Sequence, residues 1–197
     1  MPSDSSYYDE TQALGRSHPD LQLAWVQKFL DDPEVEIMQE TDRKWKDTGV
    51  VSNSMMNETV SGPHALRTRL MFKRVCHEPD SYDQTEYGYI MSVGNGVCAK
   101  AGRGHGGFSS MVLDHIASHA ARFSNPFHVP CITVHISVNY LAAVETPCVF
   151  RARAWATEVV GRKIWTKAVL ENDKGEPYAT CKALILNPTP TAKAVHL

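Results

Sequence analysis

The stretch HGGFSSMVLDHIASHAARF occupies residues 105–123. From Phe108 to Phe123 it contains no proline or glycine, which allows a helix of about four turns, and Asn125-Pro126 ends the pattern. At about 100° per residue, one side of this helix is apolar. That side holds Phe108, Val112, Ile116, Ala120 and Phe123, with Leu113 at its margin. The opposite side holds Ser110, Asp114, Ala117, Ser118 and Ala121.

The second side of the helix is unusual because every residue on it except Asp114 is small. A solvated helix face would normally carry Lys, Glu and Gln. The small residues therefore predict close approach by a second helix or by a ligand. Burying an unpaired carboxylate is costly, so Asp114 indicates a functional role or, alternatively, a solvated position beside a helix-dimer contact.

Gly106 and Gly107 open the helix. The first backbone N–H groups of a helix lack internal partners, and the positive end of its dipole favours negative charge. Glycine also lets a substrate carbonyl approach the backbone closely. The pair is thus a candidate for stabilising an oxyanion, although a glycine pair taken alone is more typical of a tight turn.

Strand patterns flank the helix on both sides. Before it, Leu66, Thr68, Leu70 and Phe72 alternate with Arg67, Arg69, Met71 and Lys73, which predicts a half-buried strand, and residues 87–93 form a second β-rich run. After it come four strand-like segments, at 131–141, 149–158, 163–170 and 178–186. In the first of these, Ile132, Val134, Ile136, Val138 and Tyr140 share one face, opposite Thr133, His135, Ser137 and Asn139. One helix packed on an antiparallel sheet predicts the α+β class.

The N-terminal part of the chain differs in character. Residues 21–30 fit a short amphipathic helix that stops at Asp31-Asp32-Pro33. Residues 34–63 are mostly polar, as in an arm that packs on a domain. We therefore expect an arm over 1–63, a single domain over 64–190 and a tail over 191–197.

Composition narrows the function classes. The 197 residues are 43% hydrophobic and 21% charged, with a formal net charge of −2, so nothing suggests nucleic acid as a partner. No apolar run approaches the ~20 residues of a membrane span, and the N-terminus has no signal or transit pattern. The five scattered cysteines read as reduced thiols. These features predict a cytoplasmic protein.

The segment HGGFSSMVLD, in which Asp114 lies nine positions after His105, resembles the PaaI-like hotdog thioesterases. Within them it is most similar to the branch of the carboxyl-terminal modulator protein, an acyl-CoA thioesterase. That branch has a functional threonine at a fixed interval before an Asn-Tyr pair, as Thr133 stands before Asn139-Tyr140, and a Gly-Arg-Lys hairpin like Gly161-Arg162-Lys163. The resemblance covers roughly residues 65–188.

The resemblance implies a single hotdog domain that acts as a homodimer with two active sites at the seam, or as a tetramer formed by two such dimers. It implies that Gly106 donates its backbone N–H to a thioester carbonyl, and that Asp114 of the other subunit is general base or nucleophile. Thr133 would position the water or the carboxylate. The chain differs from the family in a few extra residues around 124–130, and it has no clear amide side chain upstream of the glycines.

Five further residues are candidates for substrate binding. His105, expected to brace the glycine loop, and Gly107 and Ser110 adjoin the predicted carbonyl site. Arg162 and Lys163, at a hairpin tip, are suited to the phosphates of coenzyme A, although a solvated turn explains them equally well. Arg151 and Arg153 are weaker candidates for that contact.

Other chemistries fit less well. His115 and His119 have the spacing of a two-histidine metal site, but lack the H-E-x-x-H glutamate, so no metal and no cofactor is expected. Asp114 and His119 have the separation of a hydratase pair, yet five residues on a helix turn the side chains about 140° apart. No G-x-S-x-G elbow is present.

We therefore expect hydrolysis of an acyl-CoA or acyl-carrier thioester to free acid and thiol, with Asp114, Gly106 and Thr133 as catalytic residues. Two alternatives stay open. One is a hotdog lyase or tailoring enzyme for a polyketide-like acyl substrate. The other is a non-catalytic hotdog dimer that binds a partner protein or lipid.

Overall fold

One antiparallel sheet and one long helix form most of the structure, a computed structural model that describes residues 14–38, 53–125 and 131–188. The sheet order is β1-β2-β3-β7-β8-β9-β6. Its strands are β1 (Glu36–Ile37), β2 (Leu66–Val75), β3 (Thr85–Val93), β6 (Ile132–Tyr140), β7 (Cys148–Val160), β8 (Lys163–Glu171) and β9 (Pro177–Leu186). A small hairpin joins β4 (Cys98–Lys100) to β5 (Arg103–Gly104). The helical elements are η1 (Gly15–Ser17), η2 (Pro19–Leu21), α2 (Ala24–Leu30), η4 (Met55–Thr59, a π-helical turn), η5 (Asn95–Val97) and α3 (Gly106–Phe123).

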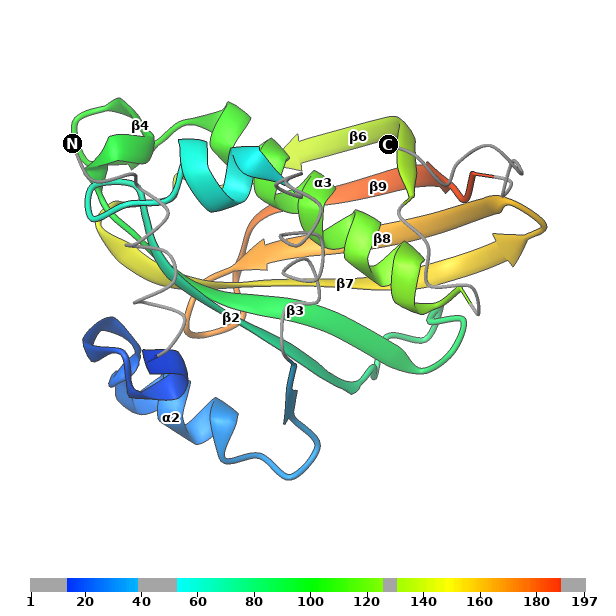
Figure 1. The fold of residues 1–197 in the computed structure, drawn as a ribbon, viewed down its shortest axis with the longest axis horizontal. Helices are drawn as coiled ribbons and strands as arrows, with labels where there is room; N and C mark the ends of the chain where they lie inside the picture. Colours follow the sequence, from blue (N-terminus) through cyan, green and yellow to red (C-terminus); the bar gives the residue numbers. More distant parts are fainter. Residues whose placement is uncertain (1–13, 39–52, 126–130, 189–197) are drawn as a thin grey trace, which may run out of the picture.

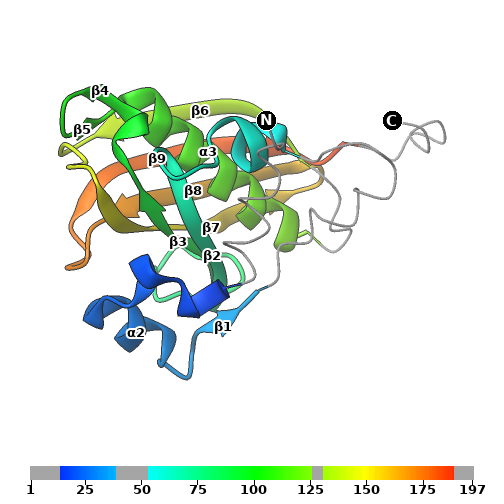
Figure 2. The same cartoon turned by 60° about the vertical axis from the view of Figure 1, so that its left-hand side comes forward.

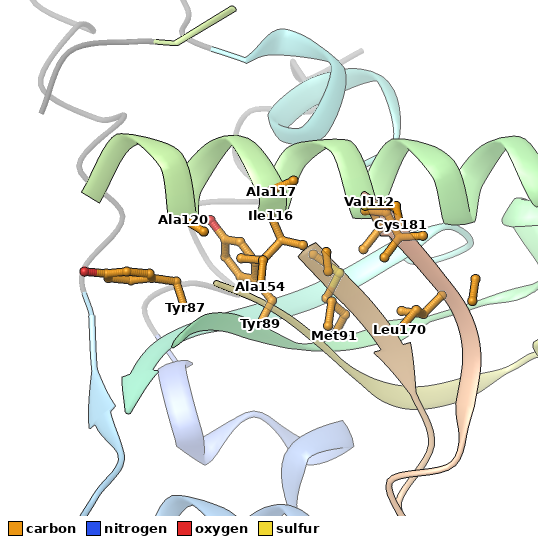
Figure 3. Close-up of a cluster of buried hydrophobic side chains, with 14 of the residues drawn as sticks. Tyr87, Tyr89, Met91, Val112, Ile116, Ala117, Ala120, Ala154, Leu170 and Cys181 are labelled. Atoms are coloured by element: carbon orange, nitrogen blue, oxygen red, sulfur yellow. The ribbon is translucent and has the colours of Figure 1, made fainter. Parts of the chain in front are cut away.

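The sheet curves around α3 on its concave side, as Figure 1 shows. The predicted α+β class and single hotdog domain are confirmed, with α3 two residues longer at its start than Phe108. Figure 3 shows the core between helix and sheet, where side chains of α3 lie above those of β3. Its fully buried members include Val112, Leu113, Ile116, Met91, Phe150, Ala154, Leu170 and Ile185. This apolar layer fixes α3 and therefore everything that α3 carries.

The outer face of the sheet carries a second core beneath the N-terminal arm (Figure 2). Helix α2 packs Phe29 edge-on against Phe72 of β2, with ring centroids 4.8 Å apart. Leu21, Val26, Leu30, Leu70 and Ile90 complete this cluster. The prediction that β2 is half-buried was therefore wrong, because Met71 packs in the main core on one face of the strand while Leu70 and Phe72 pack in the second core on the other. The predicted arm helix begins at Ala24, after a separate 3-10 turn at Pro19–Leu21.

The small-residue side of α3 is also more buried than its sequence indicates. Ala117 and Ala121 are fully buried in the main core. The sheet curves far enough for β9 and β6 to contact the helix on that side. The prediction of a whole face left for a second helix or a ligand was therefore wrong; Ser110, Asp114 and Ser118 alone of that side stay partly exposed.

Ion pairs link the strands on the outer face. Arg153 of β7 contacts Glu78 at 2.8 Å and Glu86 of β3 at 3.0 Å. Its neighbour Arg151 pairs with the buried Glu171 of β8. These contacts give both arginines a structural explanation, on the face of the sheet opposite α3.

Some predicted segments lie outside the described residues: residues 1–13 and 39–52 of the arm, most of the extra residues at 124–130, and the tail at 191–197. Within the described part, no helix has both the length and the apolar character to cross a membrane.

The docking of α2 is testable through Phe29. We expect Phe29→Ala to lower the free energy of unfolding by about 3–5 kcal/mol, because it leaves a cavity against Phe72. Leu23→Ala is the matched control, since Leu23 is 44% exposed, and should change stability by less than about 0.5 kcal/mol. Urea unfolding measures both. Equal effects of the two substitutions would contradict the assignment of α2 as an integral cover of the sheet.

Candidate active site

The start of α3 is held by its own N-cap. His105 is the N-cap residue, and its Nδ1 accepts a hydrogen bond of 2.8 Å from the backbone N–H of Gly107. The backbone N–H of His105 donates in turn to the carbonyl of Val97, at 2.8 Å. His105 therefore braces the glycine loop against the η5 turn. A Cβ on Gly107 would lie 2.9 Å from Nδ1 of His105, so the capping geometry itself requires glycine at 107.

This cap leaves one amide available at the helix start. Gly107 N–H is taken by His105, while Phe108 and Ser109 donate to the His105 carbonyl. Within the described residues, Gly106 N–H has no acceptor. It lies at the positive end of the helix dipole, where a polarised carbonyl oxygen is stabilised.

The side chain of Tyr140 lies beside Gly106. Its hydroxyl donates to the carbonyl of Gly106 at 3.3 Å and lies 2.5 Å from Oγ of Ser110. A Cβ on Gly106 would lie 3.3 Å from Cε1 of Tyr140. No role was predicted for Tyr140, although it belongs to the Asn139-Tyr140 pair. Its position at the end of a strand that flanks the helix is the feature of the sequence from which a role could have been predicted.

Asp114 and Thr133 meet on the β6 flank of α3. The Thr133 hydroxyl donates to Oδ1 of Asp114 at 2.8 Å. Ser118, one turn further along α3, lies 3.2 Å from the same hydroxyl. A hydrogen bond to an ionised carboxylate is stronger than one between neutral groups. Thr133 therefore fixes one oxygen of Asp114 and leaves the other for chemistry.

A β-bulge makes the contact between Thr133 and Asp114 possible. The register of β6 against β9 is interrupted between Thr133 and His135. Because the bulge adds one residue, Thr133 points to the same side as Ile136 and Val138, which pack against the core. Val134 is instead 53% exposed. The prediction that Thr133 lies on the face opposite Ile136 and Val138 was therefore wrong.

Gly106 and Asp114 lie eight residues apart on the same straight helix. At 1.5 Å per residue this is about 12 Å along the axis. A carbonyl bonded to Gly106 N–H is thus out of reach of Asp114 in the same copy. The structure gathers the candidates into two groups, one at the start of α3 with His105 and Ser110, and one around Asp114.

The positively charged candidates lie at the Asp114 end of the sheet. Lys163 is in register with Leu186 of β9, which is in register with Ile132 of β6, next to Thr133. Arg162 occupies the β7–β8 turn and donates from Nε to the carbonyl of Asn187 at 2.9 Å. Both residues are exposed. They are therefore grouped with Asp114 and lie far from Gly106 of the same copy.

A family model described as the thioesterase superfamily matches residues 101–179. The match spans every candidate site residue. It does not assign the chain to the carboxyl-terminal modulator branch within that superfamily. Among curated proteins, no sequence match was found.

Several solved structures are similar to this chain. A putative thioesterase from Lactococcus lactis has a TM-score of 0.51 at 12% identity, covering 54% of this chain and 84% of its own. A hypothetical thioesterase from Streptococcus pneumoniae, solved with coenzyme A, has a TM-score of 0.47 at 18% identity, with coverages of 51% and 79%. A Bacillus halodurans protein solved with CoA has a TM-score of 0.46 at 18% identity, covering 50% of this chain and 65% of its own. The chain thus spans just under two thirds of that last protein. At these identities the likeness concerns the fold.

His115 and His119 of α3 pack against the sheet on the flank away from β6. The ring of His115 stacks on Tyr89, with centroids 5.5 Å apart, and its Nδ1 accepts from the Asn53 side chain at 2.9 Å. Nδ1 of His119 lies 3.0 Å from the carbonyl of His115. Burial, more than the neighbouring His119, holds the pKa of His115 well below its ordinary value. Among the described residues no three His, Cys, Asp or Glu side chains are grouped to hold a metal.

The five cysteines lie in the described residues as free thiols. Burial raises the pKa of Cys181 in β9 to about 12. Burial raises the pKa of Cys148 in β7 to about 11. A thiol attacks a carbonyl as thiolate, so neither residue is a suitable nucleophile at neutral pH.

If His105 caps α3 through Gly107, the effect of Gly107→Ala on the free energy of unfolding should change sign when His105 is replaced by alanine. His105→Ala should lower the free energy of unfolding by about 1 kcal/mol, the usual value of an N-cap. In the native background Gly107→Ala should also destabilise, because its methyl group displaces the His105 ring. In the His105→Ala background Gly107→Ala should instead stabilise by up to about 1 kcal/mol, since alanine favours a helix more than glycine does. Urea unfolding of the four proteins measures the cycle. The same effect of Gly107→Ala in both backgrounds would contradict the capping role.

Proposed function

We propose that two copies of this chain form a dimer that hydrolyses acyl thioesters, with each active site built from both copies. The observation that carries the proposal is the pair of complementary groups on α3. Gly106 offers a backbone N–H without an acceptor in the described residues, and Asp114 is a partly exposed carboxylate oriented by Thr133. The match of residues 101–179 to the thioesterase superfamily model supports the reaction class.

The unpaired edge of β6 supports the proposed dimer. This strand pairs with β9 on one side and, among the described strands, with nothing on the other. Its exposed apolar residues include Ile132, Val134 and Tyr140, each more than half exposed. An unpaired strand edge is a template for pairing with another chain. Antiparallel pairing of two β6 edges about a two-fold axis extends the sheet across both copies.

Such pairing brings the two groups of site residues together. Thr133, near the start of β6, contacts Asp114, while Tyr140, at its end, contacts Gly106. When two β6 strands run antiparallel, the Thr133 end of one copy faces the Tyr140 end of the other. Asp114 of one copy then approaches Gly106 of its partner, which removes the separation of about 12 Å that α3 imposes within one copy.

The chemistry needs only these groups. Gly106 N–H binds the thioester carbonyl oxygen and stabilises the negative charge that develops on attack. Asp114 takes a proton from a water molecule whose oxygen attacks the carbonyl carbon; the C–S bond then breaks and the thiolate leaves. Alternatively, Asp114 attacks directly and water opens the resulting anhydride. The thiolate is a good leaving group, so no strong general acid is required.

The thiol portion of the substrate is assigned to the Asp114 side. Arg162 and Lys163 are exposed cations at that end of the sheet. In coenzyme A, phosphates lie at the far end of the thiol portion, and charge-assisted bonds to them suit these side chains. An acyl group on coenzyme A or on a carrier protein would be held in the same orientation.

Two substitutions at Gly106 separate the amide from the glycine. Gly106→Pro removes the N–H at the first helical position, where proline is tolerated. The preceding His105 has ψ of 134°, as a residue before proline prefers. We expect kcat for acyl-CoA hydrolysis to fall by about 10²–10³. Gly106→Ala keeps the N–H and should retain most of that activity, even though its Cβ lies close to Tyr140.

The same assay, with free thiol as its readout, tests Asp114. Asp114→Asn should lower kcat by at least about 10²–10⁴, the contribution of a general base. Turnover that survives Asp114→Asn would contradict the assigned site. Equal losses for Gly106→Pro and Gly106→Ala would contradict the role of the amide. No turnover of any acyl-CoA or carrier-bound thioester by the native protein would contradict the proposal as a whole.

A further inference from the structure

An apolar cavity adjoins the start of α3 on the side away from Tyr140. Its volume is about 370 Å³, within the range of small-molecule sites. Five apolar side chains line it: Met55, Val60, Val97, Phe108 and Met111. His105 and Gly107 line it as well, which places the cavity directly beside Gly106. Among the residues that the structure describes, no Asp, Glu, Lys or Arg lines it.

The cavity is open to solvent although its walls are apolar. Met55 is 53% exposed, and Phe108 and Met111 are partly exposed. Exposed apolar surface around a concave site marks a place where an apolar group binds. Methionine has three rotatable bonds and a polarisable sulfur, so Met55 and Met111 can adapt to chains of different shape.

The two walls come from different parts of the chain. Val97 precedes β4, while Phe108 and Met111 belong to the first turns of α3. Met55 and Val60 come from the arm, where Met55–Thr59 forms the π-helical turn η4. This turn is anchored by Met56, which is buried in the main core. The arm wall lies outside residues 101–179, the part matched by the thioesterase family.

We propose that this cavity binds the acyl group of the substrate, and that the arm residues Met55 and Val60 set the acyl chain length that the site accepts. The proposal rests on the proposed function, because it places the thioester carbonyl at Gly106. With the carbonyl there, the acyl chain runs past Gly107 into the cavity, while the sulfur points toward Asp114 of the partner. A volume of about 370 Å³ equals roughly a dozen water volumes of ~30 Å³. It therefore suits a medium-length aliphatic chain.

Chain length should act through burial of methylene groups. Each buried CH₂ contributes about 0.8 kcal/mol, which corresponds to roughly fourfold in affinity. We expect S-alkyl-CoA thioethers, which cannot be hydrolysed at a carbonyl, to bind about fourfold more tightly per methylene. The gain should stop once the cavity is full. Isothermal titration calorimetry with a series from ethyl to hexadecyl measures this.

Met55→Trp tests the arm wall. The larger side chain should occupy part of the cavity, shift the optimum to shorter chains and leave binding of the ethyl thioether unchanged. Leu23→Trp, at another exposed apolar position of the arm, the N-cap of α2, should leave the whole series unchanged. Both positions are exposed, so neither substitution threatens the fold.

Thioether binding and thioester hydrolysis are measured on the same proteins. The two measurements distinguish failure of the acyl cavity from failure of the proposed function. Length-dependent binding that shifts in Met55→Trp supports the cavity, even if no thioester is cleaved and the proposed function fails. Hydrolysis with no dependence on chain length, or with a length profile that Met55→Trp does not change, overturns the cavity and leaves the proposed function standing. Absence of any thioether binding overturns the cavity as well.

Discussion

Gly106 and Asp114 are carried by one rigid helix, and their separation of about 12 Å governs the functional account. Each group is well placed locally: His105 caps the helix and leaves one amide available, and Thr133 fixes Asp114. In our proposal, neither arrangement is of catalytic use within a single copy. Because β6 runs alongside α3, from Asp114 toward Gly106, a two-fold axis at its free edge would exchange the two ends. In the proposed dimer, the strand that positions the carboxylate thus also determines how the second copy approaches.

The N-terminal arm contributes to both faces of the sheet. On the outer face, α2 covers Phe72 of β2. The strand β2 therefore lies between two cores and is buried on both faces. On the concave side, η4 anchors Met56 in the main core and holds Met55 and Val60 at the edge of a cavity. The arm therefore stabilises the domain and, in our proposal, limits the acyl chain. A segment at the margin of the fold can change in this way without altering Gly106 or Asp114.

Periodicity in the sequence predicted the helix, the order of the strands and the α+β class, because long regular patterns report directly on local structure. It failed where tertiary packing overrides the period. The bulge between Thr133 and His135 places Thr133 on the same side of β6 as Ile136 and Val138. No turn residue in the sequence marks this bulge. The curvature of the sheet buries Ala117 and Ala121, which a helical wheel places opposite the core. The cavity at Met55 was not anticipated, since it joins a polar arm to a distant helix. The family resemblance assigned roles to Gly106 and Asp114 through the HGG segment and to Thr133 through its strand. The geometric argument for placing them in two copies depends on the length of α3, which the structure gives.

Subunit complementation tests the shared active site most directly. Asp114→Asn and Gly106→Pro chains, each inactive alone, are co-expressed so that mixed dimers form. If the site spans two copies, half of the dimers are mixed and each has one intact site, which restores roughly a quarter of native activity in a two-fold dimer. Activity that stays at the level of the single variants, in a sample shown to contain mixed dimers, would mean that Gly106 and Asp114 do not act across the interface, and would contradict the account.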